Sequence, residues 1–446
     1  MSRTRSQFLL VGALSGLTLV STASAINITL DYTYDSANAN FFGAGNPDGA
    51  VAGAEAKASL EAAAAYLSAV MTDTFVAIET PPVFNSEFFS GEVVWSWEAR
   101  FANPATGSLT ILDDLSIAED EVRIFAGGRA IGGTTLGVGG AGGFGVSSTP
   151  SGGFTQGEID QLDVITADFF DAVETRGEAT GFGRWGGSIS FDNDGSSTWH
   201  YDHTAEPVPG TSDFYSVALH ELVHALGFGN SDWEGLVSGG LFTGSASSAL
   251  FGGNVPVSGD QSHWIEDTES VLYGSIFEQE TAMDPDLTTG TRKLITALDV
   301  AGLEDIGWEP SVAAFDFDSD TTLDADDLDV LIAAIVGGGA ALSFDVDGSG
   351  VVDADDLRHW VERVYGSVVA DSNLDGKVDL IDLSALASGF GTSGAGWTGG
   401  DFNADNNVDL IDLSTLASVF GSDLTVPEPA GAAVLVVGLA GVVRRR

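Results

Sequence analysis

Residues 316–423 restrict the fold of this chain more than any other segment, because they repeat one loop four times. Each copy places side-chain oxygens at loop positions 1, 3, 5, 9 and 12 and continues into an apolar segment. That spacing lets a short loop surround a hard cation with about six to eight oxygens, so it predicts structural calcium (Ca2+) sites followed by helices. The predicted ligands are Asp316, Asp318, Asp320, Asp324, Asp327, Asp345, Asp347, Ser349, Asp353, Asp356, Asp371, Asn373, Asp375, Asp379, Asp382, Asp401, Asn403, Asp405, Asp409 and Asp412.

Position 6 of each loop needs a sharp turn, which glycine makes most easily. Gly350 and Gly376 occupy it in loops two and three, whereas Thr321 and Asn406 replace glycine in loops one and four and predict weaker binding there. The final ligand is Asp rather than Glu, and LSALASGFG-like segments follow, so the repeats resemble dockerin type I modules. That resemblance implies calcium-dependent folding and a cohesin-like partner. A calcium-rigidified spacer from the cell surface is the alternative.

The charge balance narrows the classes of partner. The chain has 65 Asp and Glu residues against 16 Lys and Arg residues, a formal net charge of −49. Such a surface repels nucleic acid and anionic lipid, so neither is an expected partner. There is no cysteine, which excludes a disulfide framework, a thiolate zinc site and a cysteine nucleophile.

Both ends of the chain have the composition of targeting segments. Residues 1–25 begin with Arg3 and Arg5, continue through an apolar run and end in Ala-Ser-Ala, which predicts a signal peptide. Residues 426–446 read Val-Pro-Glu-Pro, then a short apolar run, then three arginines, and resemble the PEP-CTERM sorting signal. The resemblance implies removal by an exosortase-type enzyme and delivery to the bacterial surface or extracellular matrix. The membrane is then contacted through the C-terminal segment before processing, and an ordinary anchor is the alternative.

The predicted organisation has four parts: a signal peptide at 1–25, a catalytic region at 26–312, calcium-binding repeats in two loop pairs at 313–424, and a sorting segment at 425–446. Within the catalytic region, residue spacing predicts helices over 52–71 and 159–175 and a main helix from about Ser212. Apolar clusters predict strands at 75–78, 93–95 and 187–192. The glycine-rich run at 127–154 predicts a long surface loop.

The pentapeptide HELVH at residues 220–224 carries the chemistry. On a helix, residues four apart share a face, so His220 and His224 can hold one zinc ion (Zn2+) through ring nitrogens. Glu221 stands one step around the helix, where a carboxylate can take a proton from an activated water and return it to a leaving amine. Two solvated histidines on a surface helix are the plain alternative.

The longer run HELVHALGFG resembles the metzincin peptidases, although their third zinc-binding histidine is replaced here by Asn230. Met283, before Asp-Pro, resembles the structural Met-turn of that family. An insertion before the next histidine is similar to leishmanolysin-like peptidases and implies His263 as the third ligand. The implied fold is α+β: a metzincin-like domain with a twisted sheet and an active-site helix, followed by a small α-helical EF-hand or dockerin-like module.

Ligand chemistry leaves several residues as candidates for the third zinc ligand. His263 is favoured and Asp232 is second, while Asn230 is a poor ligand. Glu266 would imitate another class of zinc peptidase, and Glu269 is a further nearby acid. His200 and His203 are candidates for a second metal, or are ordinary loop histidines.

The function predicted from these residues is a zinc-dependent endopeptidase acting on protein or peptide substrates. A sheet edge near Ile189 is expected to align the substrate by strand addition. The alternatives are a calcium-dependent adhesion protein with an inactive peptidase-like domain, and a metal-dependent hydrolase of another substrate.

Overall fold

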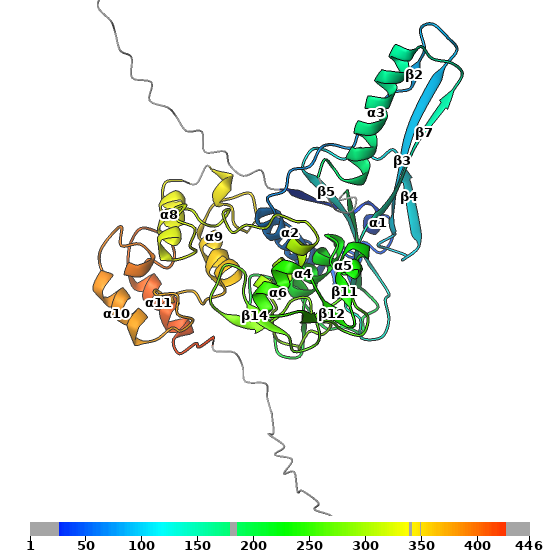
Figure 1. Cartoon of the computed structure of the whole chain (residues 1–446). Coiled ribbons are helices and arrows are strands. Elements are labelled where there is room, and N and C mark those ends of the chain that lie inside the picture. Colours follow the sequence, from blue (N-terminus) through cyan, green and yellow to red (C-terminus); the bar gives the residue numbers. More distant parts are fainter. Residues whose placement is uncertain (1–25, 179–184, 339–340, 348, 425–446) are drawn as a thin grey trace, which may run out of the picture.

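The computed structural model describes residues 26–178, 185–338, 341–347 and 349–424, and in that part the chain is a mixed α+β protein. Two four-stranded sheets, three smaller ones and helices α1 to α11 make up the described structure (Figure 1). No helix among the described residues is both long and apolar enough to cross a membrane. The predicted signal peptide (1–25) and the predicted sorting segment (425–446) lie outside the described residues.

The main sheet has the strand order β1 (Asn27–Asp31), β5 (Glu121–Arg129), β8 (Gly186–Asp192) and β6 (Gly137–Ala141). The first three strands are parallel, and β6 runs antiparallel to β8 with Gly139 opposite Ile189. All seven residues of β8 are buried, and β5 and β6 pair with its two edges. The expectation of a sheet edge near Ile189 is therefore wrong, and β6 forms the edge of this sheet in the described structure.

The glycine-rich segment 127–154 is not the surface loop that its composition predicts. It contains the end of β5, all of β6 and all of β7 (Gly143–Ser151). Glycine is needed here because neighbours approach the backbone closely: a Cβ at Gly142 would collide with the indole of Trp185. Close packing, rather than loop flexibility, explains much of the glycine content.

The second sheet forms an arm that projects from the body of the molecule (Figure 1). It consists of β2 (Phe84–Asn85), β3 (Glu92–Ala102), β4 (Leu109–Asp113) and β7, with α3 (Gln156–Glu174) packed against β7. Alternate residues of β3 are buried, as expected for a sheet with one covered face. The predicted strand at 75–78 is wrong, since Ile78 makes a single bridge to Ile117 and Phe75 packs in the core without a strand.

The predicted long helices are present as α2 (Ala50–Val70), α3 and α4 (Phe214–Ala225), and α2 packs against α4. The short helix α1 (Thr33–Ser36) precedes them. Helix α4 is capped by Asp213, one residue after the predicted Ser212, because the Asp213 carboxylate accepts the backbone N–H of Ser216. Ser212 and Asp213 also form β10, which pairs with β9 (Trp199–His200).

Short elements follow α4 and end with α7, the last described helix before residue 312. They are α5 (Ser231–Leu236), β11 (Val237–Ser238), β12 (Leu241–Phe242), α6 (Ser245–Phe251), β13 (Val255–Pro256), β14 (Glu269–Val271), β15 (Glu278–Glu280) and α7 (Ala297–Asp305). Their core is aromatic: Trp233 lies 3.8 Å from both Phe228 and Phe242 and 4.8 Å from Trp264, between ring centroids. This cluster holds the segment after α4 against the segment that carries His263.

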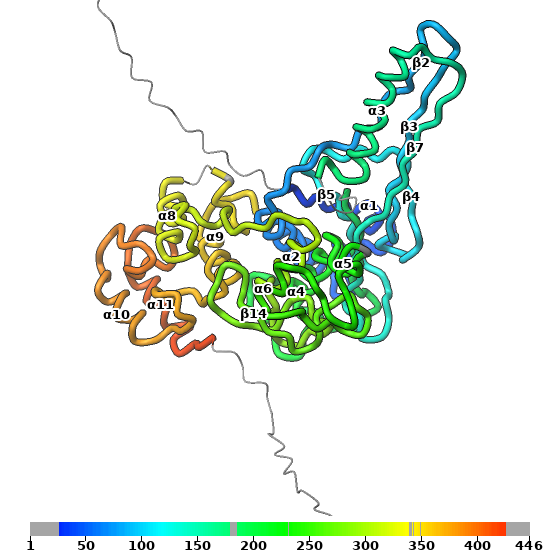
Figure 2. The backbone as a smooth tube through the Cα atoms, in the orientation of Figure 1, coloured from blue at the N-terminus to red at the C-terminus, as the bar shows by residue number. Residues whose placement is uncertain are grey.

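The C-terminal repeats fold into short helices beside this body (Figure 2). These are α8 (Ala325–Val336), η1 (Leu342–Phe344), α9 (Ala354–His359), η2 (Trp360–Tyr365), α10 (Leu380–Gly389), η3 (Trp397–Gly399) and α11 (Leu410–Val419). One buried core includes residues on both sides of position 312. Tyr66 of α2 stacks on Phe315 at 5.8 Å, and the Trp360 indole donates to the Phe315 carbonyl.

Candidate metal centre

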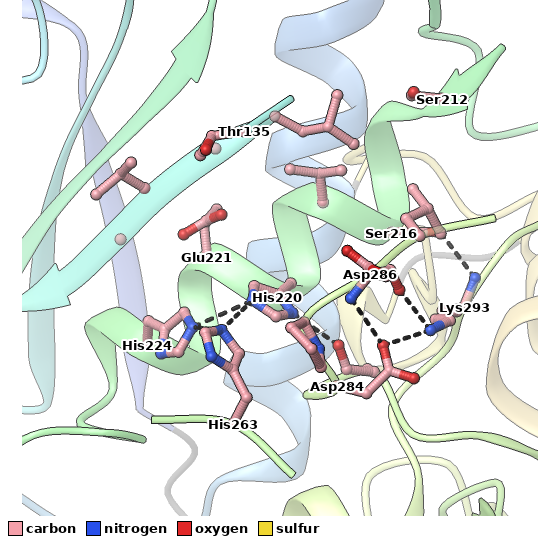
Figure 3. A pocket seen from close by; sticks show the side chains of 18 of the residues that line it. Thr135, Ser212, Ser216, His220, Glu221, His224, His263, Asp284, Asp286 and Lys293 are labelled. Atoms are coloured by element: carbon pink, nitrogen blue, oxygen red, sulfur yellow. Dashed lines mark hydrogen bonds and ion pairs between the residues drawn. The ribbon is translucent and has the colours of Figure 1, made fainter. Parts of the chain in front are cut away.

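Three histidines meet at one point in the structure. His220 and His224 lie one turn apart on α4, and His263 reaches them from the loop between β13 and β14 (Figure 3). The Nε2 atoms lie 3.1 Å apart for His220 and His224, 3.2 Å for His220 and His263, and 3.0 Å for His224 and His263. These residues form a group that could hold a metal ion.

The other ring nitrogen of each histidine has its own acceptor. His220 Nδ1 lies 2.7 Å from the Ala282 carbonyl, His224 Nδ1 lies 2.9 Å from the Phe228 carbonyl, and His263 Nδ1 lies 2.9 Å from Asp260 Oδ2. Because carbonyl and carboxylate oxygens only accept, each Nδ1 carries a hydrogen and each Nε2 presents a lone pair. Three lone pairs therefore point at one another, an arrangement that a cation satisfies.

Electrostatics keep the two helical rings neutral. Burial and the neighbouring histidines His224 and His263 push the pKa of His220 well below its usual range. Burial and His263 lower the pKa of His224 to about 4. Neutral imidazole is the form that binds a metal.

Glu221 lies next to the histidines but does not join them. Its side chain is 5% exposed and lies beneath β6, directed away from His263 (Figure 3). Burial raises the pKa of this carboxyl to about 8, and a hydrogen bond from the Gly139 backbone N–H acts in the opposite direction. A cation held by the three histidines would also favour the ionised form.

Met283 is fully buried in a tight segment beside the histidines. The carboxylate of Asp299, at the start of α7, accepts the backbone N–H groups of Ala282 and Met283 and the indole N–H of Trp264. Asp299 thereby fixes the Ala282 residue whose carbonyl orients His220. It also fixes Trp264, which follows His263. The sequence reasoning missed Asp299, although Thr296 and Asp299 have the spacing of a helix capping box, which the structure contains.

The remaining candidates for a third ligand have other places. The Asn230 side chain caps α5 by accepting the N–H groups of Asp232 and Trp233. Asp232 and Glu269 belong to no ligand group among the described residues, and Glu269 is an exposed residue of β14. Glu266 groups with Asp267 and Glu280 instead. His263 is the candidate whose ring nitrogen reaches His220 and His224.

The structure does not bring His200 and His203 together as a metal-binding group within the described residues. His200 Nε2 lies 3.1 Å from the Ala205 carbonyl. His203 stacks on Tyr215 with ring centroids 5.9 Å apart, and burial lowers its pKa to about 4. Both have the contacts of structural histidines.

The histidines open onto a cleft of about 1180 Å³ that is also lined by β6 and by the segment after Met283. Lys293 also lines this cleft, and its ammonium lies 2.5 Å from Asp284 Oδ1 (Figure 3). The same ammonium lies 2.7 Å from Glu280 Oε2. Lys293 and Asp284 are almost fully buried, so their ion pair holds the segment after Met283 in place along the cleft. The cleft is large enough for several residues of an extended peptide.

The four acidic loops share one geometry. The carboxylate at position 1 accepts the backbone N–H of position 6 in every loop, from Thr321, Gly350, Gly376 and Asn406. All four of these residues have positive φ, between 68° and 85°. Ligand atoms converge at Asp316, Asp318 and Asp320 in loop one, and at Asp345, Asp347 and Asp356 in loop two, so both groups could hold a metal ion.

Positions 9 and 12 have a second role that the spacing alone did not reveal. In every loop they form a capping box for the following helix, as Asp324 and Asp327 do for α8. Both oxygens of Asp327 accept backbone N–H groups, from Phe317 and Asp318 on one side and from Asp324 on the other. The loop and its helix are thus tied together by the same carboxylate.

Comparison with known proteins identifies no relative: no family model, no curated protein and no solved structure matches this chain.

Proposed function

We propose that this chain is a zinc-dependent endopeptidase, with a metzincin-like catalytic region that binds zinc through His220, His224 and His263. The observation that carries the proposal is the convergence of three Nε2 lone pairs whose Nδ1 partners are already fixed. A tetrahedral zinc with three nitrogen ligands needs those nitrogens about 3.4 Å apart. The observed separations of 3.0 to 3.2 Å are close to that value.

When bound, a zinc ion would lower the pKa of a coordinated water to about 7 and polarise a substrate carbonyl. Glu221 is the residue proposed to move the proton, since it is the carboxylate nearest in sequence and follows the first histidine on α4. It would accept a proton from the attacking water and donate it to the leaving amine. The long cleft, open beside β6, supports a polypeptide substrate rather than a small molecule.

The test compares four forms of the full chain for zinc content and for hydrolysis of a labelled, unfolded protein. The wild type should hold one zinc and cleave the substrate. His263→Ala should lose zinc and activity together, because two helical histidines alone leave the site incomplete. Glu221→Gln should keep zinc and lose most of its activity.

Asp232→Ala is the matched control and should keep both properties. An Asp232→Ala variant that loses zinc while His263→Ala retains it would overturn the ligand assignment. Full zinc occupancy without cleavage of any protein substrate would instead favour the adhesion alternative.

For the C-terminal repeats we propose a dockerin-like module that binds calcium through the loop carboxylates. Burial, and secondly like charges, raise the pKa of several of these carboxyls, with Asp356, Asp371 and Asp401 at about 6. A bound cation would favour the ionised form of these groups. Repeats three and four also expose equivalent apolar side chains. Leu380 and Leu410 are 72% and 71% exposed, and Ile381 and Ile411 are both 56% exposed. This repeated apolar pair supports a cohesin-like protein partner.

We further propose that the mature protein resides at the bacterial surface or in the extracellular matrix. The support is the composition of residues 1–25 and 425–446, which have the patterns of a signal peptide and a sorting signal.

A further inference from the structure

The edge strand β6 has glycine at two positions that face helix α4. Gly137 and Gly139 are two residues apart, so both present the same side of the strand. That side lies directly over Glu221. Gly140, on the opposite side of the same strand, would place a Cβ in open space, with no atom within 4 Å.

A side chain at position 137 would occupy the place of the Glu221 side chain. A Cβ there would lie 2.5 Å from Glu221 Oε1, 2.7 Å from Cγ and 2.8 Å from Cδ. Real Cβ atoms are not found so close to other heavy atoms, so one of the two groups would have to move. All three of these atoms belong to the flexible glutamate side chain, and the helix backbone is not among them.

Position 139 contacts Glu221 differently. Its backbone faces both the main chain and the carboxyl of Glu221. A Cβ at this position would collide with the main-chain oxygen of Glu221 and lie 2.9 Å from Oε2. A substitution here would therefore displace the helix as well as the side chain.

We propose that Gly137 is a positioning residue for the proton-moving carboxylate: its missing side chain leaves the space in which the Glu221 side chain lies under β6. The inference rests on the proposed function, since the seat matters for catalysis if Glu221 moves the proton. It also explains why a strand at the cleft edge contains glycines that its backbone conformation does not require, because neither Gly137 nor Gly139 has positive φ.

The first experiment measures kinetics and zinc content for Gly137→Ala in the full chain. The added methyl group should rotate the Glu221 side chain away and leave the three histidines in place. We expect zinc content equal to that of the wild type, KM within about twofold, and kcat lower by about 10- to 100-fold, the usual effect of misplacing a reacting group by about 1 Å. Gly157→Ala adds the same methyl to an exposed position of α3, outside the cleft, and should exceed Gly137→Ala in kcat by at least about tenfold. Equal kcat values for the two variants would overturn the proposal.

The second experiment uses thermal unfolding and does not depend on activity. Gly137→Ala should lower Tm by a few degrees in the wild-type background, because the methyl and the glutamate compete for one space. In a Glu221→Ala background the space is empty, so the same substitution should leave Tm unchanged or raise it. Equal losses of Tm in both backgrounds would show that the substitution at position 137 affects the strand alone. That result would overturn the proposal that Gly137 leaves space for the Glu221 side chain. If the wild type cleaves no substrate, the proposed function fails. The comparison of Tm in the two backgrounds still decides whether Gly137 positions the Glu221 side chain.

Discussion

Replacing Arg292 by methionine tests how the N-terminus of the metal-site helix is held. Arg292 forms a two-point ion pair with Asp213, with Nε to Oδ2 at 2.9 Å and Nη2 to Oδ1 at 2.7 Å. Asp213 caps α4, and its Oδ2 also accepts the backbone N–H and the hydroxyl of Ser216. The side chains are 5% and 0% exposed, so solvent does not screen this pair.

The burial sets the expected magnitude. Methionine fills most of the arginine volume but leaves the Asp213 carboxylate buried without a counter-charge, which costs about 3–5 kcal/mol of unfolding free energy. In the variant Asp213→Asn, the amide oxygen still caps the helix. Combining it with Arg292→Met removes both charges, so we expect the double variant to be less destabilised than the sum of the single variants by about 1–3 kcal/mol.

The assay is urea unfolding of zinc- and calcium-loaded protein, followed by tryptophan fluorescence. Arg358→Met is the matched control, because Arg358 pairs with Asp355 on the surface with side chains 39% and 67% exposed, and its loss should leave the transition midpoint unchanged. A cost below about 1 kcal/mol for Arg292→Met, or full additivity in the double variant, would refute the argument that the buried pair holds α4.

Three further predictions concern the calcium repeats and the chain ends. Thr321 has φ of 77°, which is unfavourable for a β-branched residue, so Thr321→Gly should tighten calcium binding to loop one by up to about 1 kcal/mol in titration calorimetry, whereas Thr322→Gly should not. Removing calcium from the full chain with a selective chelator should reduce helical circular dichroism, and identical spectra before and after would contradict a structural role for the loops. Mass spectrometry of the native surface protein should find neither residues 1–25 nor the three terminal arginines, and an intact Arg446 end would count against sorting-linked cleavage.

The helical parts of the site were predictable because their signals are local. The spacing of His220 and His224 requires a helix to bring both to one face, and the structure has α4 there. His263 is different: ligand chemistry and the resemblance to leishmanolysin-like peptidases favoured it over Asp232, and its position depends on a 38-residue connection (225 to 262) whose course no local pattern gives. The Asp260 carboxylate that orients His263 was missed as well, although it lies three residues earlier.

The strand β6 beside the cleft could not be predicted, because glycine is common both in flexible loops and in strands that pack closely against a neighbour. In a sequence, a run of glycines usually indicates a loop. In β6, and at Gly142 between β6 and β7, glycine marks places where helix α4 or Trp185 approaches too closely for a side chain. The predicted edge at Ile189 failed for a related reason: alternation identifies a strand, but pairing partners on either side of β8 come from segments remote in sequence.

The change of composition near residue 313 suggests two separate domains. The residues before and after this point nevertheless share an apolar core and also form hydrogen bonds with each other. Arg363, from the π-helical turn after loop two, donates to the His203 carbonyl, and Arg292 donates to the same oxygen while holding Asp213. A chain of partly buried contacts therefore runs from the helical turn that follows the second acidic loop to the cap of α4. Any ion that binds the folded loop more tightly than the unfolded one stabilises whatever unfolds together with it. An ion bound by the repeats would therefore also stabilise α4, which carries His220 and His224, because both parts share one core, and a spacer joined by a flexible tether would lack that link.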